Sequence, residues 1–253
     1  MASRDELISF CDELLDIRAF GDYGPNGLQV PGADEVTIVA SAVSAHLASI
    51  EAAAAAGAQL LITHHGLFWD FHPRTLSPAM AARLKAAFAA DLSIAGYHLP
   101  LDAHREIGNN VLLSRQLGFE PGPETIGDAK GRAIGVVAHS AAGIAPGELF
   151  SRVERDLRRK PLVFAEGPDR IRSIGIVTGA AASDIHTAID LGLDAFLTGE
   201  PSEHVMADAR EGHIHFVAAG HYATETLGIR ALGDVLARQF GIEHQFIEVS
   251  NPI

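Results

Sequence analysis

The chain has 253 residues, 47% hydrophobic and 20% charged, which is typical of a globular protein that buries one large core or two smaller ones. Its formal net charge of -13 argues against a nucleic-acid partner, because such proteins normally present a neutral or basic surface. Cys11 is the single cysteine, which excludes an internal disulfide and a thiolate metal cage. No apolar run reaches the about 20 residues that span a bilayer, and the N-terminus lacks signal-peptide features. We therefore expect a cytoplasmic protein without a membrane partner.

The first half of the chain alternates predicted helices and strands. Apolar residues at helical spacing predict a helix over 4–18, and a loop rich in glycine and proline follows at 21–32. The same reasoning predicts strands at 36–39, 59–63 and 92–96, and helices at 46–56, 78–89 and 109–116. This alternation is typical of an α/β architecture.

The second half repeats this pattern after a segment rich in glycine, proline and acidic residues at 118–131. We expect strands at 171–178, 195–198 and 216–219, an edge strand at 244–249, and helices at 182–190, 202–210 and 224–240. Basic residues between Arg152 and Lys160 alternate with acids and predict a solvated helix face. The predicted lobes are therefore residues 1–125 and 126–253, both α/β, with mixed sheets flanked by helices.

A weak internal repeat relates the two halves. In both, a glycine precedes a short predicted strand that ends in threonine. Each half also carries a histidine followed four residues later by a carboxylate, and these are His98 with Asp102 and His221 with Glu225. The repeat predicts two similar lobes with a metal site between them.

The pair His64 and His65 closes a short apolar run that predicts a buried strand. Two imidazoles at the end of a buried strand are costly unless they are hydrogen-bonded or bound to metal, and α/β sheets place ligands at that end. The other candidate groups also follow predicted strands, and they are His98 with Asp102, Glu200, and His221 with Glu225. Imidazole and carboxylate donors without sulfur suit zinc, iron, manganese or cobalt.

Each of these signals also has an ordinary explanation. A histidine pair is often structural, and His98 and His104 could simply cap the turn that they flank. Glu200 could be an acid near a helix N-terminus, and a histidine and glutamate four residues apart occur on many solvated helices. The prediction of a metal site rests on the joint occurrence of these histidines and carboxylates at several strand ends. The other histidines show no comparable grouping and are interpreted as surface or core residues; they are His46, His72, His139, His186, His204, His213, His215 and His244.

Several segments resemble the dinuclear metal-centre proteins called type 2 GTP cyclohydrolase I or interacting-factor-3-like proteins. They are Pro25–Val30, Leu61–His65 with Trp69 after it, Tyr97–His104 and Gly220–Leu232. The similarity spans nearly the whole chain. It departs at Gly66, where relatives commonly have proline, and this difference affects loop stiffness and not the ligands.

The resemblance implies two divalent ions per chain, zinc or iron first, with manganese, cobalt or nickel as further candidates. The implied ligands are His64, His65, Asp102, His221 and Glu225, with Glu225 as the bridge. His98 is expected in the pocket, and either His98 or His104 could transfer a proton as a catalytic residue. The resemblance also implies a ring-shaped homohexamer.

We expect a metal-dependent hydrolase acting on a small molecule, and the resemblance suggests a nucleotide whose imidazole ring is opened, as in GTP. The chain has no glycine-rich phosphate-binding motif, so Arg105 and Arg230 are the candidates for binding an anionic group. The alternative is a metal-binding scaffold or regulatory partner protein without turnover. An enzyme needs an open coordination position beside a pocket, whereas a scaffold could have closed coordination.

Overall fold

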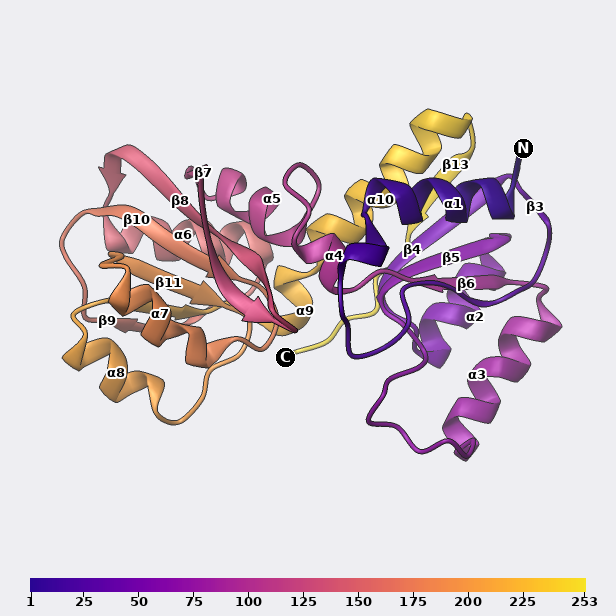
Figure 1. Cartoon of the computed structure of the whole chain (residues 1–253), viewed down its shortest axis with the longest axis horizontal. Helices are drawn as coiled ribbons and strands as arrows, with labels where there is room; N and C mark the ends of the chain where they lie inside the picture. The colour runs from indigo at the N-terminus through magenta and orange to yellow at the C-terminus, as the bar shows by residue number, and fades with distance from the viewer. The chain divides into compact units, whose positions relative to one another are not determined.

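The computed structural model describes residues 1–253, and contacts between Cα atoms divide the chain into two compact units. The first unit comprises Met1–Leu101 and Gly228–Ser250, and the second comprises Asp102–Leu227 and Asn251–Ile253. In Figure 1 the first unit therefore begins in indigo and is completed by the yellow segment Gly228–Ser250. None of the helices is long and apolar enough to span a membrane.

The first unit is built on a five-stranded sheet with the order β13-β4-β5-β6-β2. These strands are β2 (Gly27–Val30), β4 (Ile38–Ser44), β5 (Leu60–His65), β6 (Ser93–Gly96) and β13 (Glu243–Phe246). All neighbours are parallel except β2, which runs antiparallel to β6. The short strands β1 (Ala2–Ser3) and β3 (Glu35–Val36) form a separate antiparallel pair.

Helices cover both faces of this sheet. The helices that lie wholly or mostly in this unit are α1 (Arg4–Leu14), η1 (Ile17–Ala19), α2 (Leu47–Ala55), α3 (Pro78–Ala89), α4 (Leu99–Asp102) and α10 (Thr226–Phe240). The helices α2 and α3 pack on one face, where Ile50 and Ala87 join Leu61 and Ile94 in one buried cluster. Phe10 of α1 and Phe240 of α10 meet edge to face with centroids 5.4 Å apart, so these two helices lie together. Side chains alternate along β5, so the strand contributes to both layers.

The second unit has a six-stranded sheet with the order β7-β8-β10-β11-β12-β9. These strands are β7 (Glu120–Ala129), β8 (Arg132–Ile144), β9 (Leu162–Ala165), β10 (Ile171–Val177), β11 (Ala195–Thr198) and β12 (His215–Ala218). The helices are α5 (Asn109–Gln116), α6 (Pro146–Leu157), η2 (Ala182–Asp184), α7 (Ile185–Asp190), α8 (Val205–Glu211) and α9 (His221–Thr224). Residues of α5 and α6 belong to one buried cluster, and residues of α7 and α8 belong to another, so both sheet faces are covered.

The two sheets share a four-stranded motif, which confirms two similar α/β lobes with mixed sheets. The parallel strands β4, β5 and β6 are followed by antiparallel β2, and the parallel strands β10, β11 and β12 are followed by antiparallel β9. The segments that lead from β6 to His98 and from β12 to His221 differ in length by one residue. Tyr97 donates its backbone N–H to Thr63, whereas Ala219 donates to Thr198, which leaves Gly220 as an extra residue before His221.

Three local expectations were wrong. The expected loop at 21–32 contains β2, and the expected linker at 118–131 is mostly β7. The glycine and proline residues in and around both strands are typical of loops, so the sequence pattern does not predict a strand. Both strands lie at sheet edges, where such residues are tolerated. The first helix ends at Leu14 rather than near residue 18, because Asp16 adopts a left-handed φ of 47°. Contacts also place residues 102–125 with the second unit, while the division into lobes 1–125 and 126–253 stays a prediction about folding units.

Candidate metal centre

His64 and His65 end β5 in the first unit. His64 is fully buried, and its Nδ1 lies 3.0 Å from the carbonyl oxygen of Tyr97. A carbonyl accepts only, so this nitrogen carries the proton and Nε2 carries the lone pair. The His65 Nδ1 lies 3.0 Å from the hydroxyl of Ser44 on the neighbouring strand β4. Both rings are thus oriented by hydrogen bonds through Nδ1, which is typical of histidines that bind metal through the other nitrogen.

His98 follows β6 and is held by Asp22 from the glycine- and proline-rich segment. The Asp22 Oδ1 lies 2.7 Å from the His98 Nδ1, and Oδ2 accepts the backbone N–H of Leu99 at 3.0 Å. Burial alone would raise the pKa of Asp22, but hydrogen bonds from His98, Asn26 and the backbone of Tyr23 lower it below its usual value. Asp22 therefore stays a carboxylate and keeps the proton of His98 on Nδ1.

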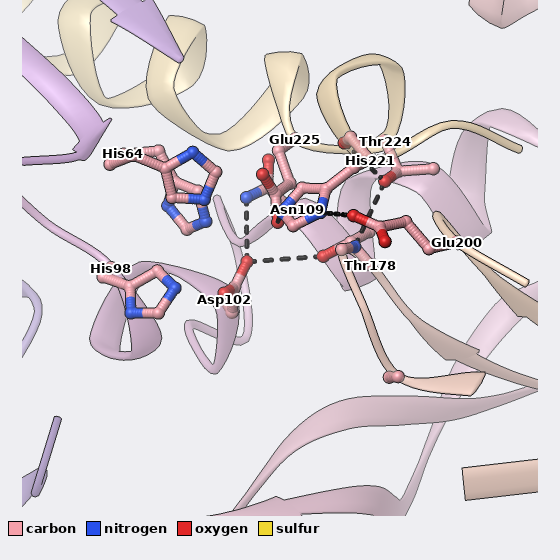
Figure 2. Close-up of polar contacts among 12 residues, drawn as sticks. His64, His98, Asp102, Asn109, Thr178, Glu200, His221, Thr224 and Glu225 are labelled. Carbon is pink, nitrogen blue, oxygen red and sulfur yellow. Dashed lines mark hydrogen bonds and ion pairs between the residues drawn. The ribbon is translucent and has the colours of Figure 1, made fainter. Parts of the chain in front are cut away.

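These three histidines form one group within the first unit. One potential ligand atom from each of His64, His65 and His98 lies within 4.8 Å of the others. The ring centroids of His64 and His98 are 5.1 Å apart, and Figure 2 shows both side chains. The Trp69 ring meets His98 edge-on with centroids 5.1 Å apart and bounds the group on that side. The group could hold a metal ion, so His98 has the position of a potential ligand as well as of a proton carrier.

In the second unit, His221 lies between two glutamates at the start of α9 (Figure 2). Its Nδ1 is 2.5 Å from the Glu200 Oε1, and its Nε2 is 3.2 Å from the Glu225 Oε1. Burial lowers the pKa of His221, but the hydrogen bonds and charges of Glu225 and Glu200 outweigh this and raise the pKa to about 9. In the metal-free protein, the imidazole is therefore protonated at pH 7.

The His221 and Glu225 pair fits a divalent cation. In the metal-free protein, a proton lies between the His221 Nε2 and the Glu225 carboxylate. A divalent ion can replace this proton, because it supplies the positive charge at the same place. Glu225 is only 2% exposed, and a buried carboxylate requires a compensating cation or hydrogen bonds. Glu200 on the opposite nitrogen of His221 completes the carboxylate–histidine arrangement that commonly supports a metal ligand.

Asp102 lies at the end of α4 and is 5% exposed. Its Oδ1 accepts a hydrogen bond from the Asn109 amide at 2.8 Å and one from the Thr178 hydroxyl at 3.4 Å (Figure 2). Both of these donors are neutral groups. The Asp102 carboxylate remains chemically suited to a divalent ion.

Gly179 brings the backbone close to the His221 and Glu225 pair. A Cβ atom at this position would lie 2.5 Å from the Glu225 Oε1 and 3.3 Å from the His221 Nε2. Gly179 also has a φ of +73° and accepts backbone hydrogen bonds from Gly199 and Glu200 at 2.8 and 3.0 Å. Only glycine fits here without moving the pair.

His104 has the contacts of a backbone cap. Its Nδ1 accepts the backbone N–H groups of Glu106 and Ile107, each at 3.2 Å, and its catalytic role stays a prediction. The two arginines considered for anion binding have other contacts. Arg105 donates to the carbonyl of Gly122, and the Arg230 guanidinium lies 3.7 Å from the centroid of the Phe246 ring.

Several residues that hold the site side chains in place are not evident from the sequence. Asp22 is 76 residues from His98, and no local pattern connects them. Asn109 and Thr178 likewise contact Asp102 only through the fold. Glu200 is a candidate from the sequence, and its contact with His221 gives it an orienting role.

The fold and these side chains define a class: an α/β protein that places histidines and carboxylates just beyond the ends of parallel strands. Within this class, residues 2–252 match the family described as Duf34/NIF3 (NGG1p interacting factor 3). The chain belongs to this family, as the sequence resemblance predicts.

Known proteins similar to this chain match it over all or nearly all of its length. A Pseudomonas aeruginosa protein named "GTP cyclohydrolase 1 type 2 homolog" is 44% identical over 247 residues, which cover 97% of each chain. Among solved structures, a structural-genomics protein of unknown function called ybgI has a TM-score of 0.94 at 38% identity. A Thermus thermophilus protein has a TM-score of 0.90 at 32% identity, and each of these two structures covers 100% of both chains.

Proposed function

We propose that this chain binds two divalent metal ions and acts as a hydrolase of the GTP cyclohydrolase 1 type 2 kind. The observation that carries the proposal is the group of His64, His65 and His98, whose potential ligand atoms lie within 4.8 Å of one another. The buried pair of His221 and Glu225 supports it with a second set of suitable donors. The name of the Pseudomonas aeruginosa relative supports a small-molecule substrate such as GTP.

The proposed ligands are His64, His65, Asp102, His221 and Glu225, with Glu225 as the bridging carboxylate. Nitrogen and oxygen donors without sulfur favour zinc or iron, with manganese, cobalt or nickel as alternatives. Two such ions, when bound, supply Lewis-acid activation of water and polarise the bond under attack. We further propose a cytoplasmic homohexamer that binds neither nucleic acid nor membrane.

His98 is the proposed proton-transfer residue. Because Asp22 keeps a proton on Nδ1, the other ring nitrogen Nε2 has the lone pair that can accept a proton. An imidazole takes and returns protons near neutral pH, as a hydrolase requires. Asp22 also accepts backbone N–H groups on both sides of this contact, so the ring is held in one orientation. His104 is the second candidate for this role.

In the proposed reaction, two water molecules in succession hydrolyse the two C–N bonds of one imidazole-ring carbon of GTP. That carbon leaves as formic acid, the ring nitrogen without the ribose gains two protons and becomes an amine, and the ribose-bearing nitrogen gains one. Proton transfer is needed both to activate water and to neutralise the departing nitrogens, and the Nε2 of His98 can serve both steps. A single oriented imidazole therefore accounts for the acid and the base.

The test combines metal analysis with turnover of a panel of nucleotides. We expect the wild type to bind two ions per chain at this centre and release formate from GTP. Glu225→Ala should lose the ions of this centre and turnover, whereas His98→Gln should keep these ions and lose turnover. His139→Gln is the matched control, because His139 is a half-exposed histidine on β8 outside the proposed site.

Three other results would each contradict a specific part of the proposal. Two ions retained by Glu225→Ala would refute the ligand set. Loss of metal by His98→Gln would make His98 a ligand rather than a proton carrier. Two ions without turnover of any nucleotide would favour the metal-binding scaffold or regulatory partner protein over the enzyme.

A further inference from the structure

A second cluster of potential metal ligands lies in the second unit on α7 and α8, which Figure 1 shows in orange. It consists of His186, His204 and Asp208, and one ligand atom from each lies within 4.8 Å of the others. None of these residues belongs to the ligand set proposed above. From the sequence we interpret both histidines as surface or core residues, because they show no grouping comparable to that of the other candidates.

The three side chains already converge on one carboxylate oxygen. Asp208 Oδ2 lies 2.6 Å from the His204 Nδ1 and 3.5 Å from the His186 Nε2. The two imidazole rings are stacked, with centroids 5.8 Å apart and an interplanar angle of 10°. A metal about 2.0–2.2 Å from each donor would need donor separations of roughly 3 Å or more, so the 2.6 Å contact has to open, whereas the 3.5 Å contact already has a suitable length.

The hydrophobic core fixes the backbone that carries these ligands. Each ligand is adjacent in sequence to a fully buried residue of one core cluster: Ile185 precedes His186, Val205 follows His204, and Ala209 follows Asp208. His204 and Asp208 are four residues apart, so they lie on one helical face, and His186 comes from a different helix. The positions of the ligands are therefore set by packing, and binding requires little rearrangement.

We propose that His186, His204 and Asp208 form a separate site for one divalent transition-metal ion. The ion is bound through His186 Nε2, His204 Nδ1 and Asp208 Oδ2, and water fills the remaining positions. The side chains are 60%, 40% and 21% exposed, respectively, so an ion and water reach the site from solvent. Two imidazoles and one carboxylate favour zinc, copper, nickel or cobalt over magnesium or calcium.

Binding replaces a proton at His204. In the metal-free protein, Nδ1–H donates to the Asp208 carboxylate, so the ion takes the place of this hydrogen. The displaced proton moves to Nε2 of the same ring or, from the protonated ring, to solvent. The bound ion then links α7 and α8, which are separated in the chain by β11. Because the ion binds only the folded arrangement, it stabilises the second unit as its concentration rises.

The experiment uses the full chain after removal of metals by a chelator. Zinc is titrated into the Glu225→Ala protein alone, and into Glu225→Ala combined with His186→Gln, Asp208→Asn or the control His139→Gln. In this background we expect one remaining zinc ion per chain with the control. His186→Gln and Asp208→Asn each remove a direct ligand and should weaken zinc binding. The loss should be at least roughly 10–100-fold, which is typical when a residue that only hydrogen-bonds to a ligand is removed.

A second measurement keeps the test independent of the proposed function. Paramagnetic Cu²⁺ added to wild-type protein at low ratio should broaden the ring resonances of His186 and His204, while that of His139 stays sharp. Equal zinc binding by the His186→Gln, Asp208→Asn and His139→Gln proteins would refute the site. Unbroadened His186 and His204 resonances with Cu²⁺ would refute it as well. The comparison among the double variants and the Cu²⁺ readout do not require turnover by the proposed hydrolase, so absence of turnover leaves both unaffected.

Discussion

Replacing Gly179 with alanine tests how closely the backbone approaches the His221 and Glu225 pair. The new Cβ would lie 2.5 Å from the Glu225 Oε1, and ordinary contact begins near 3.4 Å. The carboxylate must therefore move by 3.4 minus 2.5, or about 0.9 Å. The loop cannot easily withdraw, because the Gly179 carbonyl accepts two backbone hydrogen bonds. We expect the strain to fall on Glu225.

Gly192→Ala is the matched control for this substitution. Gly192 has a φ of +67°, close to the +73° of Gly179, but a Cβ there meets nothing within 4 Å. Both variants should lose about 1–2 kcal/mol through left-handed strain. Only Gly179→Ala should also bind the proposed metal about 10–100-fold more weakly, the range typical when the support of a ligand is lost.

The assays are thermal unfolding, metal titration and NMR titration of the His221 ring. In the metal-free protein, moving the Glu225 carboxylate away should lower the pKa of His221 from about 9. The raised pKa contributes stability that is fully present below about pH 6.5 and is lost as the pH rises through about 9, and this contribution should shrink in Gly179→Ala. Equal metal affinity and an equal His221 pKa in the two alanine variants would refute the reasoning.

Two further predictions concern the first unit. Asp22→Asn removes the carboxylate that accepts from His98, and we expect a loss of about 1–3 kcal/mol in urea unfolding at pH 7. Because the pKa of Asp22 is lowered, the stability that it adds is present above about pH 4 and lost as the pH falls further, so the variant's deficit should shrink in acid; a constant deficit would contradict this. Burial raises the pKa of Cys11 to about 12, so a thiol reagent at pH 8 should label it only as the chain unfolds; rapid labelling of folded protein would contradict this burial.

The regular elements could be predicted because local patterns determine them. The helix Pro78–Ala89 was predicted with its observed bounds, since Pro78 suits the first helical turn and Ser77 caps it by accepting the N–H of Met80. The strand before His64 was evident from its apolar run. By contrast, β7 was missed because its glycine and proline residues resemble a linker, and only pairing with β8 makes it a strand.

The candidate site was predictable only in part, for a related reason. His64 and His65 are adjacent, and His221 and Glu225 are four residues apart, so short patterns identify them. Asp22 was not predicted, because its contact with His98 joins segments 76 residues apart. The group of His186, His204 and Asp208 was missed as well, since packing of α7 against α8 brings it together.

The discontinuous first unit has a consequence for synthesis on the ribosome. Its edge strand β13 pairs with β4 through residues 243–246, which are made after the whole second unit segment Asp102–Leu227. At about 5–20 residues per second, translation of that segment alone takes roughly 6–25 s. During this time β4 lacks its partner and exposes an open sheet edge, and at the end of it the second unit already has nearly all of its chain. The second unit can therefore be completed before the first unit, although synthesis of the first unit begins earlier. The first unit is the one that needs protection from aggregation.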